Sequence, residues 1–416
     1  MLNKLKPVLA LACLVVVSSC GGGSGSSGSS GGDAAKITCQ LPQQLNVLGD
    51  SCIIKFTLYE TSYENFKSYP TNILKYPRYI NTIGANAGWE SPPKSEVIPQ
   101  IAYGDFKIKD ELSFFVAFTN YAWWDIASGY GQSYSAATSN SKYLSDFTFW
   151  KINSDLSMTM ISTFKGCLHP RKSIVADFNK DGKPDIFVAC HGYDGIPFPG
   201  EKSKILLSNN SGNYAISDVG ENAFTHGVSA GDVNGDGYPD IVTADLYFYI
   251  NQKDGTFKRN DSLIRNLPKS PYNNPGYFNI ELIDLNNDGI LDIIAGGHEY
   301  NTQGADTKIW YGDKDGTFGK LTKTIPPVKG WGVVNDFTII KSNGKNILYI
   351  NRTTDPTFDS SGSWYQGSLV QRYNLDTGES ILSDKLTTPN WVPWMIPKIQ
   401  NGQIGVGPFD RAGFFQ

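Results

Sequence analysis

Short apolar runs alternate with polar loops through most of the sequence, and the clearest of them come in pairs. The pairs are Ile174–Ala176 with Ile186–Ala189, Val228–Ala230 with Ile241–Ala244, and Ile280–Ile283 with Ile293–Ala295. Runs of three to five residues that are rich in isoleucine and valine have the length of strands, whereas helices are longer. An acidic loop of nine residues joins the two runs of each pair. The pattern therefore predicts three β-hairpins.

A second hairpin signal follows each of these pairs. The segments KILLSNNSGNYA (204–215), YFYINQKDGTFKR (247–259) and KIWYGDKDGTFGK (308–320) each place a glycine-containing turn between two strand-like runs. Each unit then holds four antiparallel strands, and the acidic loops repeat after 55 and then 52 residues. Units of this length and content are typical of the blades of a β-propeller.

Weaker copies extend the repeat in both directions. First hairpins begin near residues 101, 174, 228, 280, 332 and 395. We therefore predict an all-β propeller of six four-stranded blades, with room for a seventh in residues 37–100. The segment 52–60 could return to supply an outer strand of the last blade. The first copy keeps Asp105 but has Lys107 and Lys109 where further acids would stand, and the fifth copy has lost its acids.

The acidic loops share the pattern D-x-N-x-D-G-x-x-D. Calcium takes six to eight oxygen ligands, and glycine at the sixth position permits a sharp turn. We expect each loop to bind one Ca²⁺ through its side chains at positions 1, 3, 5 and 9 and its backbone carbonyl at position 7. The predicted ligands are Asp177, Asn179, Asp181, Lys183 and Asp185; Asp232, Asn234, Asp236, Tyr238 and Asp240; and Asp284, Asn286, Asp288, Ile290 and Asp292. An EF-hand or dockerin loop requires an acid at position 12, where these loops have Val188, Thr243 and Ala295. The alternative is a set of metal-free turns.

The loop pattern, followed by a strand, a turn and G-x-F, resembles the FG-GAP/VCBS repeat of integrin alpha-subunit heads and many bacterial surface proteins. The three clear repeats cover about residues 170–320. The resemblance implies a calcium-binding propeller. It also implies that partners bind on the face opposite the calcium loops.

The N-terminal sequence is typical of an export signal. Lys4 and Lys6 precede an apolar run that is too short to span a membrane permanently, and the segment ends in VSSC. We expect residues 1–20 to be a lipoprotein signal with Cys20 as the lipidated N-terminus, 21–36 a Gly/Ser-rich tether, 37–100 a segment that helps to close the propeller, and 101–416 the propeller itself. Gly21 favours the outer membrane. Ordinary secretion is the alternative.

Charge and cysteine content narrow the choice of partners. Without residues 1–20 the chain has 34 basic and 40 acidic residues, so three Ca²⁺ would bring its net charge near zero, and nothing indicates nucleic-acid binding.

Four cysteines remain after the signal segment, and an oxidising compartment favours two disulfides. The local pairing is Cys39–Cys52 with Cys167–Cys190, one of three connectivities; free thiols, or a zinc site with the neighbouring histidines, are alternatives.

All four histidines fall at one end of the predicted hairpins, away from the acidic loops. His169 and His226 precede first strands, and His191 and His298 follow second strands. Trp331 and Trp394 hold similar positions. These six residues form the predicted ligand-binding face, because exposed aromatic side chains suit a sugar or a protein partner. The alternative is that they plug the centre of the propeller.

Two classes of function fit these features. We favour a monomeric, calcium-stabilised envelope protein that binds a glycan or another protein and reaches the membrane only through its lipid. A polysaccharide lyase or hydrolase on the same scaffold is the alternative, although no known catalytic signature occurs in the sequence.

Overall fold

The computed structural model describes residues 43–45, 52–54, 100–104, 106, 113–117, 144–152, 158–193, 198–209, 211–265, 276–299, 305–342, 345–357, 367, 369–382, 395–400 and 403–408. The chain divides into two compact units, Met1–Lys36 and Ile37–Gln416, and every described residue lies in the second. The predicted lipid site Cys20, the disulfide partner Cys39, the residues Lys107 and Lys109, and Trp394 lie outside the described residues.

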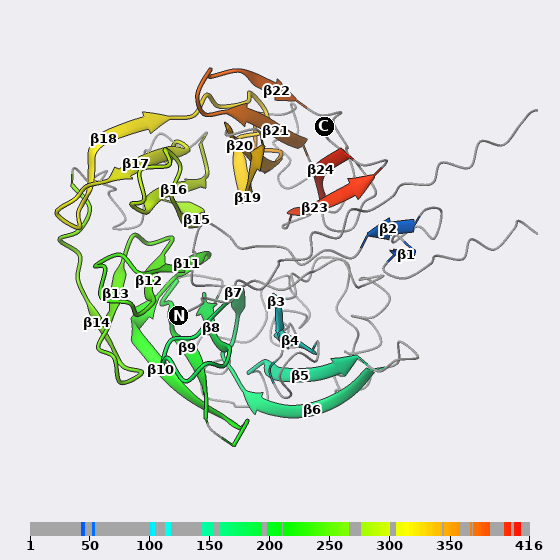
Figure 1. Cartoon of the computed structure of the whole chain (residues 1–416), viewed down its shortest axis with the longest axis vertical. Helices are drawn as coiled ribbons and strands as arrows, with labels where there is room; N and C mark the ends of the chain where they lie inside the picture. The colour runs from blue at the N-terminus through cyan, green and yellow to red at the C-terminus, as the bar shows by residue number, and fades with distance from the viewer. Residues whose placement is uncertain are drawn as a thin grey trace, which may run out of the picture. The chain divides into compact units, whose positions relative to one another are not determined.

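The described residues form five four-stranded antiparallel sheets, two further hairpins and no helix (Figure 1). The first sheet is β3 (Gln100–Gly104), β4 (Ser113–Ala117), β5 (Asp146–Ile152) and β6 (Met158–Lys165). The second is β7 (Pro170–Ala176), β8 (Asp185–Cys190), β9 (Glu201–Ser208) and β10 (Tyr214–Ala223). The third is β11 (Val228–Gly231), β12 (Asp240–Thr243), β13 (Phe248–Asn251) and β14 (Phe257–Arg259). The fourth is β15 (Tyr277–Ile283), β16 (Asp292–Gly297), β17 (Lys308–Gly312) and β18 (Phe318–Thr324). The fifth is β19 (Val333–Ser342), β20 (Lys345–Thr353), β21 (Leu369–Asn374) and β22 (Ser380–Leu382).

The sheets follow one another in a propeller-like arrangement. The first strands of successive sheets contact one another in chain order, from β3 through β7, β11, β15 and β19 to β23 (Met395–Gln400), which pairs with β24 (Gln403–Pro408). The fourth strands lie at the rim (Figure 1). β1 (Gln43–Leu45) and β2 (Cys52–Ile54) form their own hairpin, and β2 contacts β23. The prediction of an all-β fold with hairpins starting near these six positions is confirmed. No described segment forms a helix that could cross a membrane.

The apolar core is divided into layers, each lying between two neighbouring sheets. One layer joins Phe149 of the first sheet to Val188 of the second, the next joins Phe187 to Ile241 of the third, and two more join the third sheet to the fourth and the fourth to the fifth. A sheet buries both of its faces in this way, so the short isoleucine- and valine-rich runs of the sequence are buried on either side.

A polar network links the first strands across the centre. Lys172 of β7 contacts Asn279 (2.7 Å) and Glu281 (2.5 Å), both on β15, although β11 separates the two strands in the sheet order. Ser229 of β11 donates to the other oxygen of Glu281, and Asn279 donates to Asp336 of β19. Because the Lys172 side chain is almost completely buried, its charge needs this carboxylate as a partner. The network therefore joins four sheets.

A disulfide bond joins Cys167 to Cys190, as the local pairing predicted. Cys167 lies just before β7 and Cys190 ends β8, so the bond ties the entry of the second sheet to the end of its second strand. Both sulfur atoms are buried and are no longer available as thiolates. The alternative of a zinc site that uses these two cysteines is therefore wrong.

We expect removal of this disulfide to destabilise the protein without changing its fold. Closing a loop of this length restricts the unfolded chain by about 3 kcal/mol. The variant Cys167→Ala/Cys190→Ala should therefore unfold at lower denaturant concentration than the wild type. Addition of a reductant should destabilise the wild type more than the variant, because the variant keeps only Cys39 and Cys52 of the cysteines after the signal segment and has no Cys167–Cys190 bond to lose. Equal midpoints for the two proteins would contradict this role.

Candidate calcium loops and histidine face

The three acidic loops adopt one hydrogen-bonding pattern. In the first loop Asp177 accepts the backbone N–H groups of Asp181 (3.0 Å) and Gly182 (2.9 Å), and the Asn179 side-chain oxygen accepts the same N–H of Asp181 (3.0 Å). Two side-chain oxygens therefore converge on one point. The corresponding distances are 3.0 and 2.9 Å to the N–H of Asp236, and 3.2 and 3.0 Å to the N–H of Asp288.

Two residues in each loop have left-handed backbone conformations. The glycine at position 6 has a φ of 81°, 88° or 83°, which confirms the sharp turn expected there. Position 4 is also left-handed in all three loops, with Lys180, Gly235 and Asn287 at 58°, 71° and 62°. A lysine rarely adopts this conformation, so the first loop holds its backbone in a less favourable state.

The aspartate at position 9 has a structural role that the sequence did not predict. Asp185 is fully buried, and its carboxylate accepts the N–H of Phe178 at position 2 (2.8 Å) and of Ser208 at the end of β9 (2.6 Å). Asp240 binds the N–H groups of Val233 and Asn251 in the same way, and Asp292 those of Leu285 and Gly312. The side chain at position 9 thus closes its loop and fastens it to the third strand.

The first sheet achieves the same closure without a charge. Ser113 stands eight residues after Asp105, at the place of the ninth aspartate, and its buried hydroxyl accepts the N–H of Phe106 (3.0 Å). A neutral acceptor is therefore sufficient to close the loop. The carboxylates at position 9 in the second, third and fourth sheets therefore need a further explanation.

Burial makes these carboxylates costly. Loss of solvent raises the pKa of Asp185, Asp240 and Asp292 to about 7, and loss of solvent also raises the pKa of Asp177.

In the described part of the chain no three histidine, cysteine, aspartate or glutamate side chains are grouped closely enough to hold a metal ion. The oxygens that converge belong to an aspartate and an asparagine, so a hard cation would have to draw in the carboxylate at position 5.

The four histidines meet at the opposite end of the hairpins. The ring centroids of His169 and His191 lie 4.6 Å apart, and those of His191 and His226 lie 4.5 Å apart. Phe278 stacks on His226 at 4.4 Å and contacts His298 at 4.1 Å. The four side chains come from the start of β7, the end of β8, the start of β11 and the end of β16, so three sheets contribute to one row of rings.

The disulfide holds the beginning of this row. Cys190 immediately precedes His191, Cys167 lies two residues before His169, and the N–H of His191 donates to the carbonyl of His169 (2.8 Å). His169 and His191 are almost completely buried, whereas His226 and His298 are half-buried. The accessible part of the row therefore lies toward the third and fourth sheets.

Two phenylalanines extend the row toward solvent. Phe224 contacts both His191 (3.5 Å between ring centroids) and His226 (5.2 Å), and Phe198 packs edge-on against Phe224 at 5.3 Å. Phe198 is 50% exposed and has a φ of 53°. An exposed aromatic residue in a left-handed conformation costs stability, and such strain concentrates at functional sites. We call His169, His191, His226, His298, Phe198, Phe224 and Phe278 the histidine face.

Trp331 does not belong to the exposed part of this face. Its side chain is fully buried, and its backbone carbonyl accepts a hydrogen bond from Arg352, which forms a buried ion pair with Glu299 (2.6 Å). The prediction that Trp331, His169 and His191 contact a partner directly is wrong, because all three side chains are almost completely buried. Phe198, Phe224 and Phe278 were missed, although Phe224 stands two residues before His226 in the sequence.

The histidine side chains are neutral near pH 7. Burial lowers the pKa of His169, His191 and His226 well below 6.5, and Arg171 lowers all three further. Neighbouring histidines also lower the pKa of His191 and His226. Burial, followed by Arg171, lowers the pKa of His298 to about 4. Neutral imidazole rings can donate and accept hydrogen bonds and present apolar faces, which suits a ligand that carries both hydroxyl groups and apolar patches.

Comparisons with known proteins agree with part of this description. Residues 173–243 match the family model described as an FG-GAP-like repeat. That range contains the first two acidic loops, so the resemblance is confirmed there. A search of the curated proteins finds no match.

The chain is also similar to a number of solved structures, among them the following three. Two are candidate 6-phosphogluconolactonases, from Bacteroides uniformis (10% identity, 76% of this chain and 80% of that one, TM-score 0.44) and from Bacteroides fragilis (13%, 76% and 77%, 0.43). The third is a protein from Lactobacillus plantarum (11%, 73% and 81%, 0.40).

Acid should destabilise the histidine face. The folded protein binds protons on these histidines less readily than the unfolded chain does, so their contribution to stability is complete above pH 6.5 and is lost as the pH falls toward 4. Replacing His226 with glutamine should reduce the slope of unfolding free energy against pH by up to about 1.4 kcal/mol per pH unit. Denaturant titrations of both proteins at matched pH values measure this difference. Parallel pH profiles would contradict it.

Proposed function

We propose that this protein is a calcium-stabilised binding protein of a bacterial cell envelope, which recognises a glycan or a protein partner through the histidine face. The observation that carries the proposal is the row of seven aromatic rings, which comes from separate connections and ends in the exposed, left-handed Phe198. Chain segments that pack only for stability do not require such strain at an exposed position. Rigid aromatic side chains supply large contact areas at low entropic cost.

Three features support a location of the protein in the cell envelope. The signal-like segment 1–20 with Cys20, the Gly/Ser-rich segment after it and the disulfide Cys167–Cys190 all fit export to an oxidising compartment. The lipid on Cys20 and an outer-membrane position are part of the proposal. The count of six blades is also part of the proposal. The contact between β2 and β23 fits an N-terminal segment that helps to close the propeller.

The donors of the acidic loops fit calcium. Each loop offers carboxylate and amide oxygens, which are hard ligands, and in all three loops two of these oxygens lie close enough to accept the same backbone N–H. Asp177, Asn179, Asp181 and Asp185, with the carbonyl of Lys183, would hold one ion, and their counterparts would hold two more. A bound cation supplies positive charge beside the buried carboxylates. The neutral Ser113 in the sheet whose loop lacks the acids supports this explanation.

Calcium content tests the loops directly. We expect three ions in the dialysed wild type and two in the variant Asp236→Ala, measured by elemental analysis. Removing the ion with a chelator should lower the melting temperature, because an ion present at a hundred times its dissociation constant stabilises the native state by about 2.7 kcal/mol per site. The control is Asp254→Ala, an exposed aspartate in the β13–β14 turn of the same sheet, which should keep three ions. Wild-type protein without calcium would overturn this part of the proposal.

A glycan-binding experiment tests whether the histidine face is the binding site. On a glycan array, Phe198→Ala should weaken the wild-type signal at least tenfold, because removing an aromatic anchor typically costs about 2 kcal/mol or more. The melting temperature should stay near that of the wild type, since Phe198 is half exposed. Leu321→Ala is the matched control, because Leu321 is a more exposed apolar side chain on β18.

Three other outcomes would be informative. A Phe198→Ala variant that binds like the wild type would contradict the assignment of the face. Release of reducing ends from the arrayed polysaccharides would favour the lyase or hydrolase. A wild type that binds no glycan would leave a protein partner as the remaining form of the proposal.

A further inference from the structure

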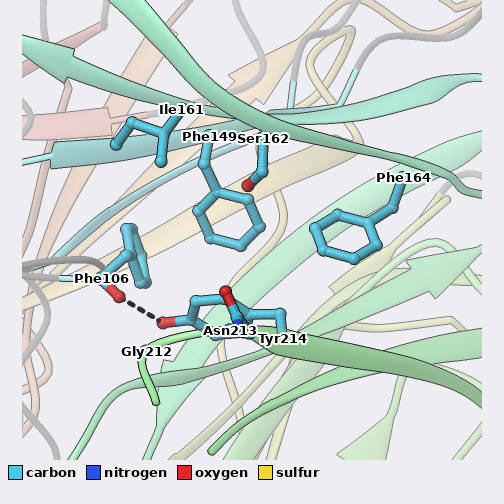
Figure 2. A pocket seen from close by; sticks show the side chains of 8 residues that line it. All are labelled: Phe106, Phe149, Ile161, Ser162, Phe164, Gly212, Asn213 and Tyr214. Atoms are coloured by element: carbon cyan, nitrogen blue, oxygen red, sulfur yellow. Dashed lines mark hydrogen bonds between the residues drawn. The ribbon is translucent and has the colours of Figure 1, made fainter.

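A pocket opens between the first and second sheets, away from the histidine face. Its volume is about 260 Å³, and Figure 2 shows its lining: Phe106, Phe149, Ile161, Ser162, Phe164, Gly212, Asn213 and Tyr214. The β9–β10 turn that forms one wall is fastened to the first acidic loop, because Lys183 donates to the carbonyl of Asn209 and Asn179 donates to that of Ser208. The pocket therefore lies at the acidic-loop end of the second sheet.

Aromatic rings form the floor and two walls. Phe106 and Phe149 are buried and contact each other edge-on at 5.3 Å, whereas Tyr214 stacks on Phe149 at 4.6 Å. Phe164 meets Phe149 edge-on at 6.1 Å and is half-buried. The Tyr214 hydroxyl donates to the carbonyls of Pro184 (2.8 Å) and Phe106 (3.1 Å). These bonds fix the Tyr214 ring before any ligand arrives, which favours binding.

The polar part of the lining that the structure describes is small and uncharged. It consists of Ser162, Asn213 and the backbone of Gly212, and none of the described lining residues is a lysine, arginine, aspartate or glutamate. The Ser162 hydroxyl makes no hydrogen bond to any other residue that the structure describes, and Figure 2 shows it beside the Phe149 ring. A ligand that suits this described lining is neutral, with an apolar surface on one side and a hydrogen-bonding group on the other.

We propose that this pocket binds one neutral pyranose ring of a glycan. The C–H groups on one face of a pyranose carry partial positive charge and pack favourably on the negative face of an aromatic ring. Its hydroxyl groups would reach Ser162 and Asn213. The pocket is smaller than the sites that hold drug-sized molecules, so it fits a single sugar ring better than an extended acyl chain. A charged sugar would have to give up its hydration without gaining a charged partner among the described lining residues.

Saturation-transfer NMR on the full chain tests this site. The probes are the methyl pyranosides of glucose, galactose and mannose, with methyl glucuronide as the charged comparison. We expect at least one neutral pyranoside to bind the wild type, with transfer strongest to the C–H protons of one ring face. The glucuronide should bind at least tenfold more weakly.

Three variants distinguish the pocket from the histidine face. Phe164→Ala should weaken binding of the neutral pyranoside about tenfold, and Ser162→Ala about fivefold, because one loses a wall and the other a hydrogen-bonding group. Ser162→Ala removes no described hydrogen bond, so it remains informative if Phe164→Ala folds poorly. Phe198→Ala should bind the probe like the wild type. Absence of binding by all three neutral pyranosides, or a loss caused by Phe198→Ala and not by Ser162→Ala, would overturn the proposal, and neither result depends on the outcome of the face experiment.

Discussion

In three successive sheets a buried aspartate accepts an amide from the start of its own loop and another from the end of the third strand. This closure sets the position of the residue that follows the first aspartate of the loop. Phe178 and Leu285 insert from that position into the apolar layers that join their sheets to the next ones, and Val233 packs against the layer between the third and fourth sheets. The closure of a surface loop and the packing of neighbouring sheets thus depend on the same carboxylate.

One hairpin carries different chemistry at its two ends. In the second sheet the acidic loop joins β7 to β8 at one end, while His169 and His191 flank the same two strands at the other. Because antiparallel strands pair residue by residue, the loop fixes the register that sets the two histidines side by side. The disulfide Cys167–Cys190 then holds that end closed. Oxygen ligands and aromatic rings can therefore occupy one small motif without competing for space.

The sequence predicts what depends on local pattern and misses what depends on partners far along the chain. The hairpins follow from isoleucine- and valine-rich runs, and the sharp turn of each loop follows from its glycine at position 6, because both are properties of neighbouring residues. The buried Trp331 lies beside Arg352, which donates to its backbone carbonyl and pairs with Glu299, 53 residues away. Likewise, nothing local to Asp185 reveals that its carboxylate binds the amide of Ser208. The acid spacing matches what a calcium ligand set requires, so the pattern could not distinguish a ligand from a clamp.

Almost all of the packing joins each sheet only to the next, and a chain of such pairwise contacts could separate one sheet at a time. Lys172 departs from this scheme, because its ammonium group is held by Glu281 two sheets away and the network continues to Asp336 of the fifth sheet. If the second sheet separated from the others, Glu281 of the fourth sheet would lose the lysine that balances its charge. The central network therefore couples the second to fifth sheets directly, so that a modular repeat gains, over these four sheets, some of the cooperativity of a single globular core.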